Sequence, residues 1–233
     1  GLKTMSNKPN KMITFSFDDG NIEDIRLVEI LNKYKLKCTF NLSASRLSEV
    51  YSWDNNGREV KHFNYMEYPN LYEGHEVACH GYSHPRLQLL DRKTVYNEIS
   101  LDRKLLSAVY GKDIKGMAYP YGSYSDMVLE VLKECGISYC RTIKNTHEFN
   151  MPENPLLWHP TLHHLDGDKF KIADEFFALE TEKPVVYYIW GHSYELITEK
   201  QWQEFQRFCK YISGRNDIWY CTNIEIIEEY GKV

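Results

Sequence analysis

Apolar runs typical of buried strands alternate with amphipathic segments along almost the whole chain, and this order limits the fold more than any other feature. About seven or eight strand–helix pairs follow one another. Because successive parallel strands need a crossover, usually a helix, the order predicts a mainly parallel sheet. At 233 residues, one large α/β domain is expected. We predict a distorted or incomplete (β/α)7-8 barrel, with an open doubly wound sheet as the alternative.

The expected elements can be given by residue number. Strands are expected at 12–17, 36–42, 75–79, 114–118, 137–142, 185–190 and 218–221, and helices at 22–34, 91–109, 125–135, 168–181, 199–212 and 224–230. Asn21, Asp91 and Ser125 are the expected N-caps, and Gly111 and Gly136 the helix stops. Residues 51–73 are aromatic, polar and aperiodic, which predicts a long surface excursion of the kind that often carries function. Residues 144–155 are expected to form a loop.

Composition narrows the class of partner. The net charge is −5 and the Lys and Arg residues are scattered, which argues against nucleic acid or an anionic membrane surface. No apolar run approaches the roughly 18 residues of a membrane-spanning helix. The 14% aromatic content suits packing and also stacking against sugar rings. Six cysteines form no CxxC pair, so disulfides stay open. The chain begins with Gly1, and residues 1–11 are expected to be a flexible arm before a domain at 12–233.

Polar residues gather where the expected strands end. Asp18 and Asp19 follow the first strand, His80 and His84 a later one, and His192 follows the strand at 185–190. In a barrel or an open sheet, such residues meet at one edge. Two histidines four apart and one carboxylate make a His₂-Asp set that suits Zn²⁺ or a similar divalent cation. Each signal is weak alone, since Asp-Asp-Gly is also ordinary turn chemistry.

Four motifs in order give a stronger indication. FSFDDG, HGYSHP, AYPYG and IWGH lie between residues 14 and 192. Together they resemble the motifs of the polysaccharide deacetylases of carbohydrate esterase family 4, the NodB-homology group. The resemblance implies a distorted (β/α) barrel that hydrolyses an N-acetyl group from an amino sugar or glycan with the help of a metal. Residues 12–233 would then be the catalytic domain, and an N-acetylated carbohydrate its substrate.

The resemblance also implies roles for single residues. By position, Asp18 resembles the catalytic base, His192 the general acid, and the backbone N–H of Tyr121 the oxyanion donor. These roles make chemical sense, because an amide is a poor electrophile and its departing nitrogen needs a proton. A histidine with an ordinary pKa near 6.5 can supply that proton.

The same comparison implies the metal ligands. Asp19, His80 and His84 resemble the family's carboxylate and histidine ligands. Zn²⁺ is the expected cofactor, with Co²⁺, Ni²⁺ or Mn²⁺ as alternatives, because such a site accepts several ions. A ligand role for Asp19 would explain how two neighbouring carboxylates both stay ionised.

One departure from the family pattern concerns the catalytic base. The family's third motif commonly reads Arg-Pro-Pro-Tyr, and its Arg orients the catalytic Asp. Here Ala118 stands where that Arg is expected. Arg141, which also lies at a strand end, is our candidate replacement. The alternative is that Asp18 is held in another way.

A second departure is the stretch from Trp158 to His164, where the family's fourth motif is not clear. Its histidines either line the substrate groove, orient His192 or are simply packed, and a second metal site is the least favoured option. Glu195 either pairs with a sugar hydroxyl or is a plain charge before a helix. His75 is expected to be a satisfied core histidine, whereas His62 and His147 fall in loops and carry no signal. The expected substrate-binding residues are Tyr119, Pro120, Trp158, His159, Trp190 and Glu195.

Two other functions stay open. One is hydrolysis of a different, non-sugar amide C–N bond by the same machinery. The other is a carbohydrate-binding protein that has lost its activity, an option that the missing Arg keeps open. Glycan substrates lie outside the cell, so we expect export to the periplasm or cell surface, with any signal peptide absent from this chain. The sequence leaves the oligomeric state undefined.

Overall fold

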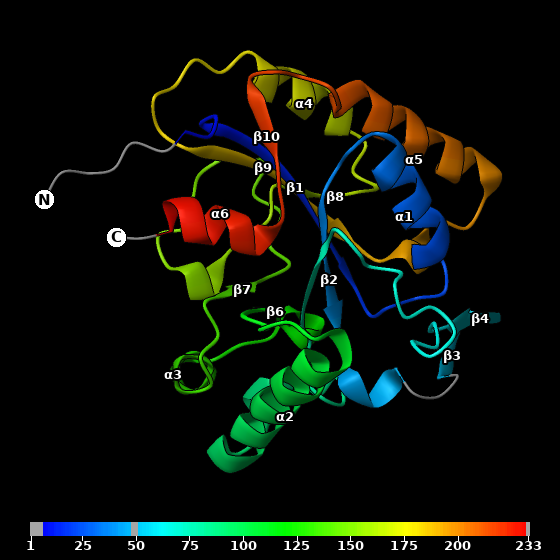
Figure 1. Ribbon diagram of the computed structural model, residues 1–233, viewed down its shortest axis with the longest axis vertical. Coiled ribbons are helices and arrows are strands. Elements are labelled where there is room, and N and C mark those ends of the chain that lie inside the picture. The colour runs from blue at the N-terminus through cyan, green and yellow to red at the C-terminus, as the bar shows by residue number, and fades with distance from the viewer. Residues whose placement is uncertain (1–6, 48–50, 232–233) are drawn as a thin grey trace, which may run out of the picture.

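The computed structural model describes residues 7–47 and 51–231 and is built around one curled parallel sheet (Figure 1). The strand order is β7-β6-β5-β2-β1-β9-β8, and β10 also pairs with β1. The strands are β1 (Lys11–Asp18), β2 (Cys38–Leu42), β5 (Glu76–Cys79), β6 (Gly116–Ala118), β7 (Tyr139–Arg141), β8 (Leu162–His163), β9 (Val185–Gly191) and β10 (Ile218–Tyr220). Every pairing between them is parallel.

Strand β1 lies at the centre of this sheet. All of its eight residues are buried, as expected for a strand covered on both faces. On one edge it pairs with β9 along most of its length. On the other edge its first residues pair with β10 and its last residues with β2.

The two ends of the sheet approach each other through residues 158–163. The Trp158 N–H donates to the Cys140 carbonyl (3.0 Å), and the Thr142 N–H donates to the Trp158 carbonyl (2.9 Å). A few residues later, the Thr161 N–H donates to the Tyr188 carbonyl of β9 (2.8 Å), where β8 begins to pair. The sheet therefore curls into a distorted (β/α) barrel. The barrel prediction is confirmed over the open doubly wound alternative.

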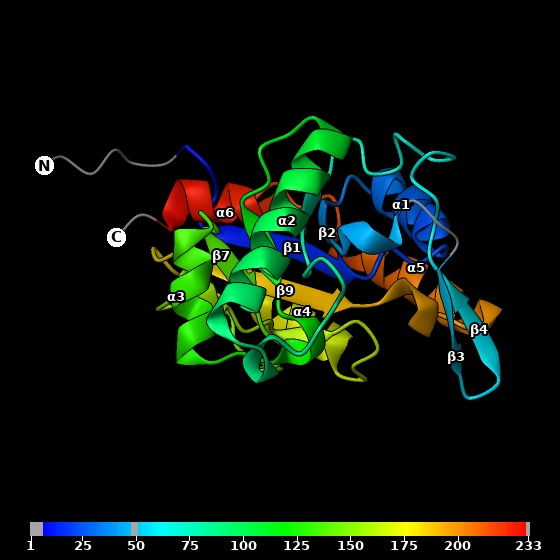
Figure 2. The same ribbon diagram turned by 90° about the horizontal axis from the view of Figure 1, so that it is seen from below.

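Six α-helices within the described residues lie around the outside of the sheet. They are α1 (Asp24–Lys33), α2 (Arg92–Tyr110), α3 (Asp126–Glu134), α4 (Lys169–Phe177), α5 (Glu199–Ile212) and α6 (Asn223–Tyr230). Helices α1, α4 and α5 cover one side, and α2 and α3 pack near β5 to β7 (Figures 1 and 2). Helix α5 illustrates why these helices pack on the sheet. Its buried residues recur at helical spacing, and one of them, Phe205, contacts the rings of Phe15 and Phe17 edge-on.

Helix caps largely follow the sequence. The Asp91 side chain accepts the Thr94 N–H at the start of α2, and Ser125 accepts the Val128 N–H at the start of α3. Gly111 adopts the left-handed conformation that ends α2. The expected N-cap at Asn21 is wrong, because α1 begins later, with Glu23 at the N-cap position. The expected helix at 168–181 is also too long, since α4 ends at Phe177.

The excursion at residues 51–73 contains a β-hairpin that the sequence analysis missed. Its strands are β3 (Ser52–Asn55) and β4 (Arg58–Lys61), which pair antiparallel and project from the body of the domain (Figure 2). Asn56 and Gly57 connect them, both with positive φ (52° and 87°). Asn-Gly is the strongest short signal for such a two-residue turn, so the information was present in the sequence.

The remaining expectations concern the chain start, the cysteines and membrane insertion. Residues 1–6 of the expected arm lie outside the described residues, and Lys11 already belongs to β1. The division into arm and domain stays a prediction. All six cysteines fall within the described residues, where they are buried free thiols. Among the helices described, none has the length and apolar character needed to cross a bilayer.

Candidate active site

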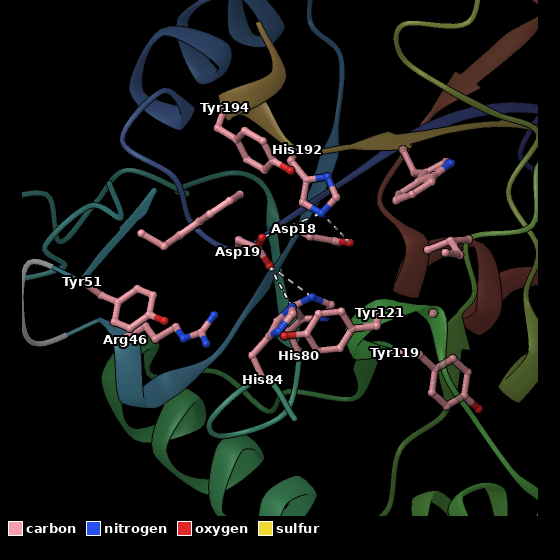
Figure 3. Close-up of a pocket in the computed structure, with 14 residues that line it drawn as sticks. Asp18, Asp19, Arg46, Tyr51, His80, His84, Tyr119, Tyr121, His192 and Tyr194 are labelled. Carbon is pink, nitrogen blue, oxygen red and sulfur yellow. Dashed lines mark ion pairs between the residues drawn. The ribbon is translucent and has the colours of Figure 1, made fainter. Parts of the chain in front are cut away.

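The carboxyl ends of β1, β5, β6 and β9 open into one pocket of about 450 Å³ (Figure 3). The pocket brings together most of the residues singled out from the sequence. Those that line it are Asp18, Asp19, His80, His84, Tyr119, Tyr121, Trp190 and His192. The chain positions of these residues span most of the domain, so the parallel sheet is what gathers them.

Three of these residues converge on one point. The Nε2 atoms of His80 and His84 lie 3.3 and 3.4 Å from Asp19 Oδ1. The backbone makes this possible with two residues in the left-handed region, Asp19 (φ 84°) and His84 (φ 58°). Gly81 (φ 79°) turns the chain between the histidines, and a Cβ there would meet Pro85 at 3.1 Å. Such strain persists only where the surrounding structure enforces it, and it is concentrated at functional sites.

The chemistry of this trio fits a divalent cation. His80 Nδ1 lies 2.7 Å from the Ala118 carbonyl oxygen, which can only accept, so Nδ1 carries a hydrogen. In a neutral His80, the Nε2 lone pair then faces the lone pairs of Asp19, which is unfavourable unless a positive charge lies between them. Asp19 Oδ1 is buried and has no hydrogen-bond partner within the described residues. Burial would raise the Asp19 pKa, but the two histidines hold it well below its ordinary value.

Asp18 is held by Arg141. Arg141 Nη1 donates to Asp18 Oδ1 at 2.9 Å, and Nη2 donates to Oδ2 at 2.5 Å. Ser16 Oγ accepts a further hydrogen bond from Nη1 (2.6 Å), and Asn41 Nδ2 donates to Asp18 Oδ1 (2.9 Å). Burial opposes ionisation of Asp18, but the charge and hydrogen bonds of Arg141, together with the nearby His80 and His192, lower its pKa. The arginine expected at position 118 is thus replaced in space by Arg141, whereas Asn41 was missed by the sequence analysis.

His192 faces the two carboxylates with one nitrogen and Glu195 with the other. Its Nε2 lies 4.0 Å from Asp18 Oδ2 and 3.8 Å from Asp19 Oδ2. Its Nδ1 lies 3.2 Å from Glu195 Oε1, which also accepts the His192 backbone N–H (2.6 Å). Burial alone would lower the pKa of His192, but Glu195 and the two aspartates raise it to about 9. The raised pKa favours the form of His192 that carries a proton on Nε2, the nitrogen that faces the two aspartates.

Glu195 is surrounded by three histidines. His163 Nε2 lies 2.9 Å from both carboxylate oxygens, and His164 Nε2 lies 3.1 Å from Oε1. These contacts turn Glu195 toward His192, and Glu195 is not among the residues that line the pocket, so its expected substrate contact stays a prediction. The histidines support His192 through Glu195, which is one of the roles considered for them. The 2.9–3.1 Å separations are hydrogen-bond lengths. Gly191 leaves space for them, because a Cβ there would lie 2.1 Å from His164 Cδ2.

Three other expected substrate contacts do not line this pocket. Trp158 is 1% exposed and packs edge-on against Tyr139 and Tyr188, so it belongs to the core. His159 contacts Thr142 Oγ1 (2.6 Å) and lines a separate pocket of about 320 Å³. Pro120 is buried inside the turn whose neighbouring tyrosines line the pocket.

The remaining histidines are structural. His75 Nδ1 accepts the Cys38 N–H (3.1 Å), and Nε2 contacts Asn32 Oδ1 (2.7 Å). The expectation of a satisfied core histidine is confirmed. His62 stacks on Tyr51 (ring centroids 5.1 Å apart), and the exposed His147 pairs with Asp166.

One wall of the pocket was not foreseen. Arg46, Tyr51, Trp53, Ile143 and Tyr194 line it together with the residues above. Tyr51 and Trp53 come from the hairpin region, and Trp53 meets Tyr194 edge-on (5.3 Å). The only signal in the sequence was the aromatic character of residues 51–73.

Comparison with known proteins agrees with this geometry. A family model described as polysaccharide deacetylase matches residues 5–140, which is more than half of the chain. The chain belongs to the polysaccharide deacetylase family. The matched region holds Asp18, Asp19, His80 and His84, whereas Arg141 and His192 come after it.

The family resemblance extends to characterised relatives. The peptidoglycan-N-acetylglucosamine deacetylase PgdA of Listeria monocytogenes is 30% identical over 125 residues, which are 53% of this chain and 24% of that protein. The chain therefore spans about a quarter of the length of that relative.

Solved structures show the same fold. A family 4 carbohydrate esterase from Streptomyces lividans, solved in complex with acetate, superposes with a TM-score of 0.57 and 16% identity, covering 92% of both chains. A family 4 pseudoenzyme from Bacillus anthracis superposes with a TM-score of 0.53 and 15% identity, covering 86% of this chain and 62% of the other. At such identities the likeness concerns the fold alone.

Proposed function

We propose that this domain hydrolyses an N-acetyl group from an amino sugar within a glycan and needs a divalent cation to do so. One observation carries the proposal: Asp18 and His192 lie beside the Asp19, His80 and His84 trio in a single pocket. A base, an acid and a set of cation ligands are together what amide hydrolysis requires.

The cation would be held by Asp19 Oδ1 and the Nε2 atoms of His80 and His84. When bound, it would polarise the amide carbonyl and make the attacking water more acidic. Zn²⁺ is the ion we favour for this donor set, with Co²⁺, Ni²⁺ or Mn²⁺ as alternatives.

The chain's own residues would carry the protons. Asp18 would take a proton from the attacking water, and Arg141 keeps Asp18 ionised and fixes the direction of its oxygens. His192 would give its Nε2 proton to the departing nitrogen, and Glu195 stabilises the charged ring. The backbone N–H of Tyr121 is our candidate donor to the developing oxyanion.

The aromatic lining supports a sugar as the substrate. Tyr51 and Tyr121 are 38% and 48% exposed at the pocket, and Trp53 and Trp190 complete its apolar surface. Tyrosine and tryptophan faces suit flat ligand surfaces such as pyranose rings. By analogy with PgdA, whose name gives peptidoglycan N-acetylglucosamine as its substrate, we propose a glycan outside the cell and hence export.

Two alternatives remain testable. The pseudoenzyme among the structural neighbours shows that this fold also occurs without activity. The complete set of base, acid and ligands in this chain supports activity, because binding alone needs neither a base nor an acid. A domain that hydrolyses a small non-sugar amide would use the same machinery.

The deciding experiment is acetate release from a panel of N-acetylated oligosaccharides. Zinc-loaded wild type and Asp18→Asn are compared, with and without a chelator. We expect release that requires both the metal and Asp18. Release from small amides alone would favour the non-sugar hydrolase, and a folded, zinc-bound wild type without any release would favour the binding protein.

A further inference from the structure

Two arginine side chains flank the pocket, each stacked on a tyrosine that lines it. Arg46 Cζ lies 4.4 Å from the ring centroid of Tyr51, and Arg86 Cζ lies 4.0 Å from that of Tyr121. Tyr51 precedes β3 and Tyr121 follows β6, so the two pairs belong to different walls. Figure 3 shows Arg46 and Tyr51 on one side of His84, with Tyr121 on the other.

Arg46 is itself part of the pocket lining. Within the described residues, its Nη2 donates one long hydrogen bond of 3.5 Å to the Ser83 carbonyl. Over residues 7–47 and 51–231, neither Arg46 nor Arg86 has a carboxylate within ion-pair distance. Arg58 of the nearby hairpin differs, because it pairs with Glu23 at 2.9 Å. Arg46 therefore presents charged donors to whatever enters the pocket.

The charge of the site indicates which class of ligand the Arg46 donors would bind. Asp18 is neutralised by Arg141, and Asp19 faces two histidines as a candidate cation ligand. With a divalent cation in place, the pocket wall is positive although the whole chain carries −5. A neutral sugar placed over Arg46 would leave part of its hydrogen-bonding capacity unused, which is costly once water is excluded.

We propose that Arg46, assisted by Arg86, binds an anionic group, a carboxylate or a phosphate, on the glycan whose acetamide reaches Asp18. This inference rests on the proposed function and adds the substrate class to it. A guanidinium offers a planar pair of donors that matches either anion. Stacking on Tyr51 holds the Arg46 plane in place before the ligand arrives, which reduces the ordering needed on binding.

The test uses ligand pairs that differ by one anionic group. The carboxylate pair is the disaccharide of N-acetylglucosamine and N-acetylmuramic acid with its neutral methyl ester. The phosphate pair is N-acetylglucosamine 6-phosphate with N-acetylglucosamine. Dissociation constants are measured by calorimetry on the zinc-loaded Asp18→Asn protein, so that turnover does not interfere, and kcat/KM is measured on zinc-loaded protein with Asp18 intact.

We expect at least one anionic ligand to bind about tenfold or more tightly than its neutral counterpart. Arg46→Gln should remove that preference and Arg86→Gln should reduce it. Arg92→Gln is the matched control, since Arg92 pairs with Glu130 and Glu134 on the outer helices. Added salt should weaken binding of the anionic ligand but not of the neutral one.

The outcomes separate this inference from the proposed function. Equal binding within both pairs, or a preference that survives Arg46→Gln, would overturn the inference even if acetate is released. A preference that depends on Arg46 without acetate release from any glycan would uphold the inference and overturn the deacetylase. Whichever pair shows the preference identifies the anion.

Discussion

Arg141 and Asp18 lie 123 residues apart in the chain and form a buried, two-pronged ion pair where β7 and β1 end. Both side chains are almost fully excluded from water. The pair joins strands on different parts of the barrel, because β7 ends the hydrogen-bonded path and β1 lies in its middle. One interaction thus links the integrity of the barrel to the state of the candidate base.

The first prediction concerns this pair. Arg141→Ala should leave Asp18 buried without its partner, which costs about 3–5 kcal/mol of folding free energy in comparable cases. The rate of acetate release should fall by about 10²-fold or more, because Asp18 loses its orientation and its low pKa. Arg141→Lys keeps the positive charge but loses the pair of guanidinium donors that bind both Asp18 oxygens. This variant should therefore recover more of the folding stability than of the rate of acetate release. Urea unfolding and kcat measured side by side would check this, and unchanged kcat in Arg141→Ala would refute the orienting role.

The second prediction concerns Glu195 and His192. A general acid must be protonated, and the raised His192 pKa of about 9 keeps it so across neutral pH. Glu195→Gln removes the hydrogen bond to a carboxylate that most raises this pKa, so the alkaline limb of the kcat–pH profile should move down by at least about one pH unit. Glu199→Gln is the control, since Glu199 pairs with Arg26 at the surface. A profile that does not move would show that Glu195 has no influence on the acid.

The third prediction concerns the candidate cation site. Zn²⁺ should raise the thermal midpoint of chelator-treated wild type, because a ligand that binds only the folded state stabilises it. Asp19→Asn should bind Zn²⁺ much more weakly and lose most of this shift, while Asp166→Asn, a change to a carboxylate outside the site, should keep it. Calorimetric titration with Zn²⁺ alone provides the measurement. Equal zinc affinity in Asp19→Asn and wild type would exclude Asp19 as a ligand.

The fourth prediction concerns Glu76, a buried carboxyl on the opposite side of the barrel from the pocket. It accepts hydrogen bonds from Thr39, Tyr139 and the Ile224 N–H. Burial nevertheless raises its pKa from 4.5 to about 7. A raised pKa means that Glu76 binds its proton more tightly in the folded state than in the unfolded state. The stabilisation that this gives is complete below about pH 4.5 and is lost as the pH rises to about 7.

The contribution of Glu76 to the free energy of unfolding should therefore fall between pH 5 and pH 7, by up to about 1.4 kcal/mol per pH unit. Other buried groups add to the measured slope with both signs, because burial raises the pKa of Asp24 and Asp102 to about 7 and lowers that of His62 and His75 to about 4. The Glu76 contribution is therefore the difference in slope between wild type and Glu76→Gln, in which the variant should lose less stability as the pH rises. Urea unfolding at several pH values measures the slope. An identical slope in wild type and variant would mean that Glu76 does not titrate in this range.

The sequence by itself determined the elements and the strand-end chemistry. Apolar runs and capping residues such as Asp91 and Ser125 are local features, and local interactions decide where a helix starts. The proximity of Asp18 and Asp19 to His80 and His84 could also be predicted, because the carboxyl ends of parallel strands lie at one edge of the sheet. The hairpin at Asn56-Gly57 was equally local and could have been predicted from its turn.

Only the tertiary structure decided which side chains face the pocket and which partners they meet. Trp158 and Glu195 carry chemistry suited to a sugar site, yet the curl of the sheet buries the first and turns the second toward three histidines. Arg46 reaches the site from a short 3₁₀ helix after β2 that has no motif of its own. Spacing along the chain fixes neither direction nor distance between remote residues. Those depend on how far the sheet twists and on where residues 158–163 bring its ends together.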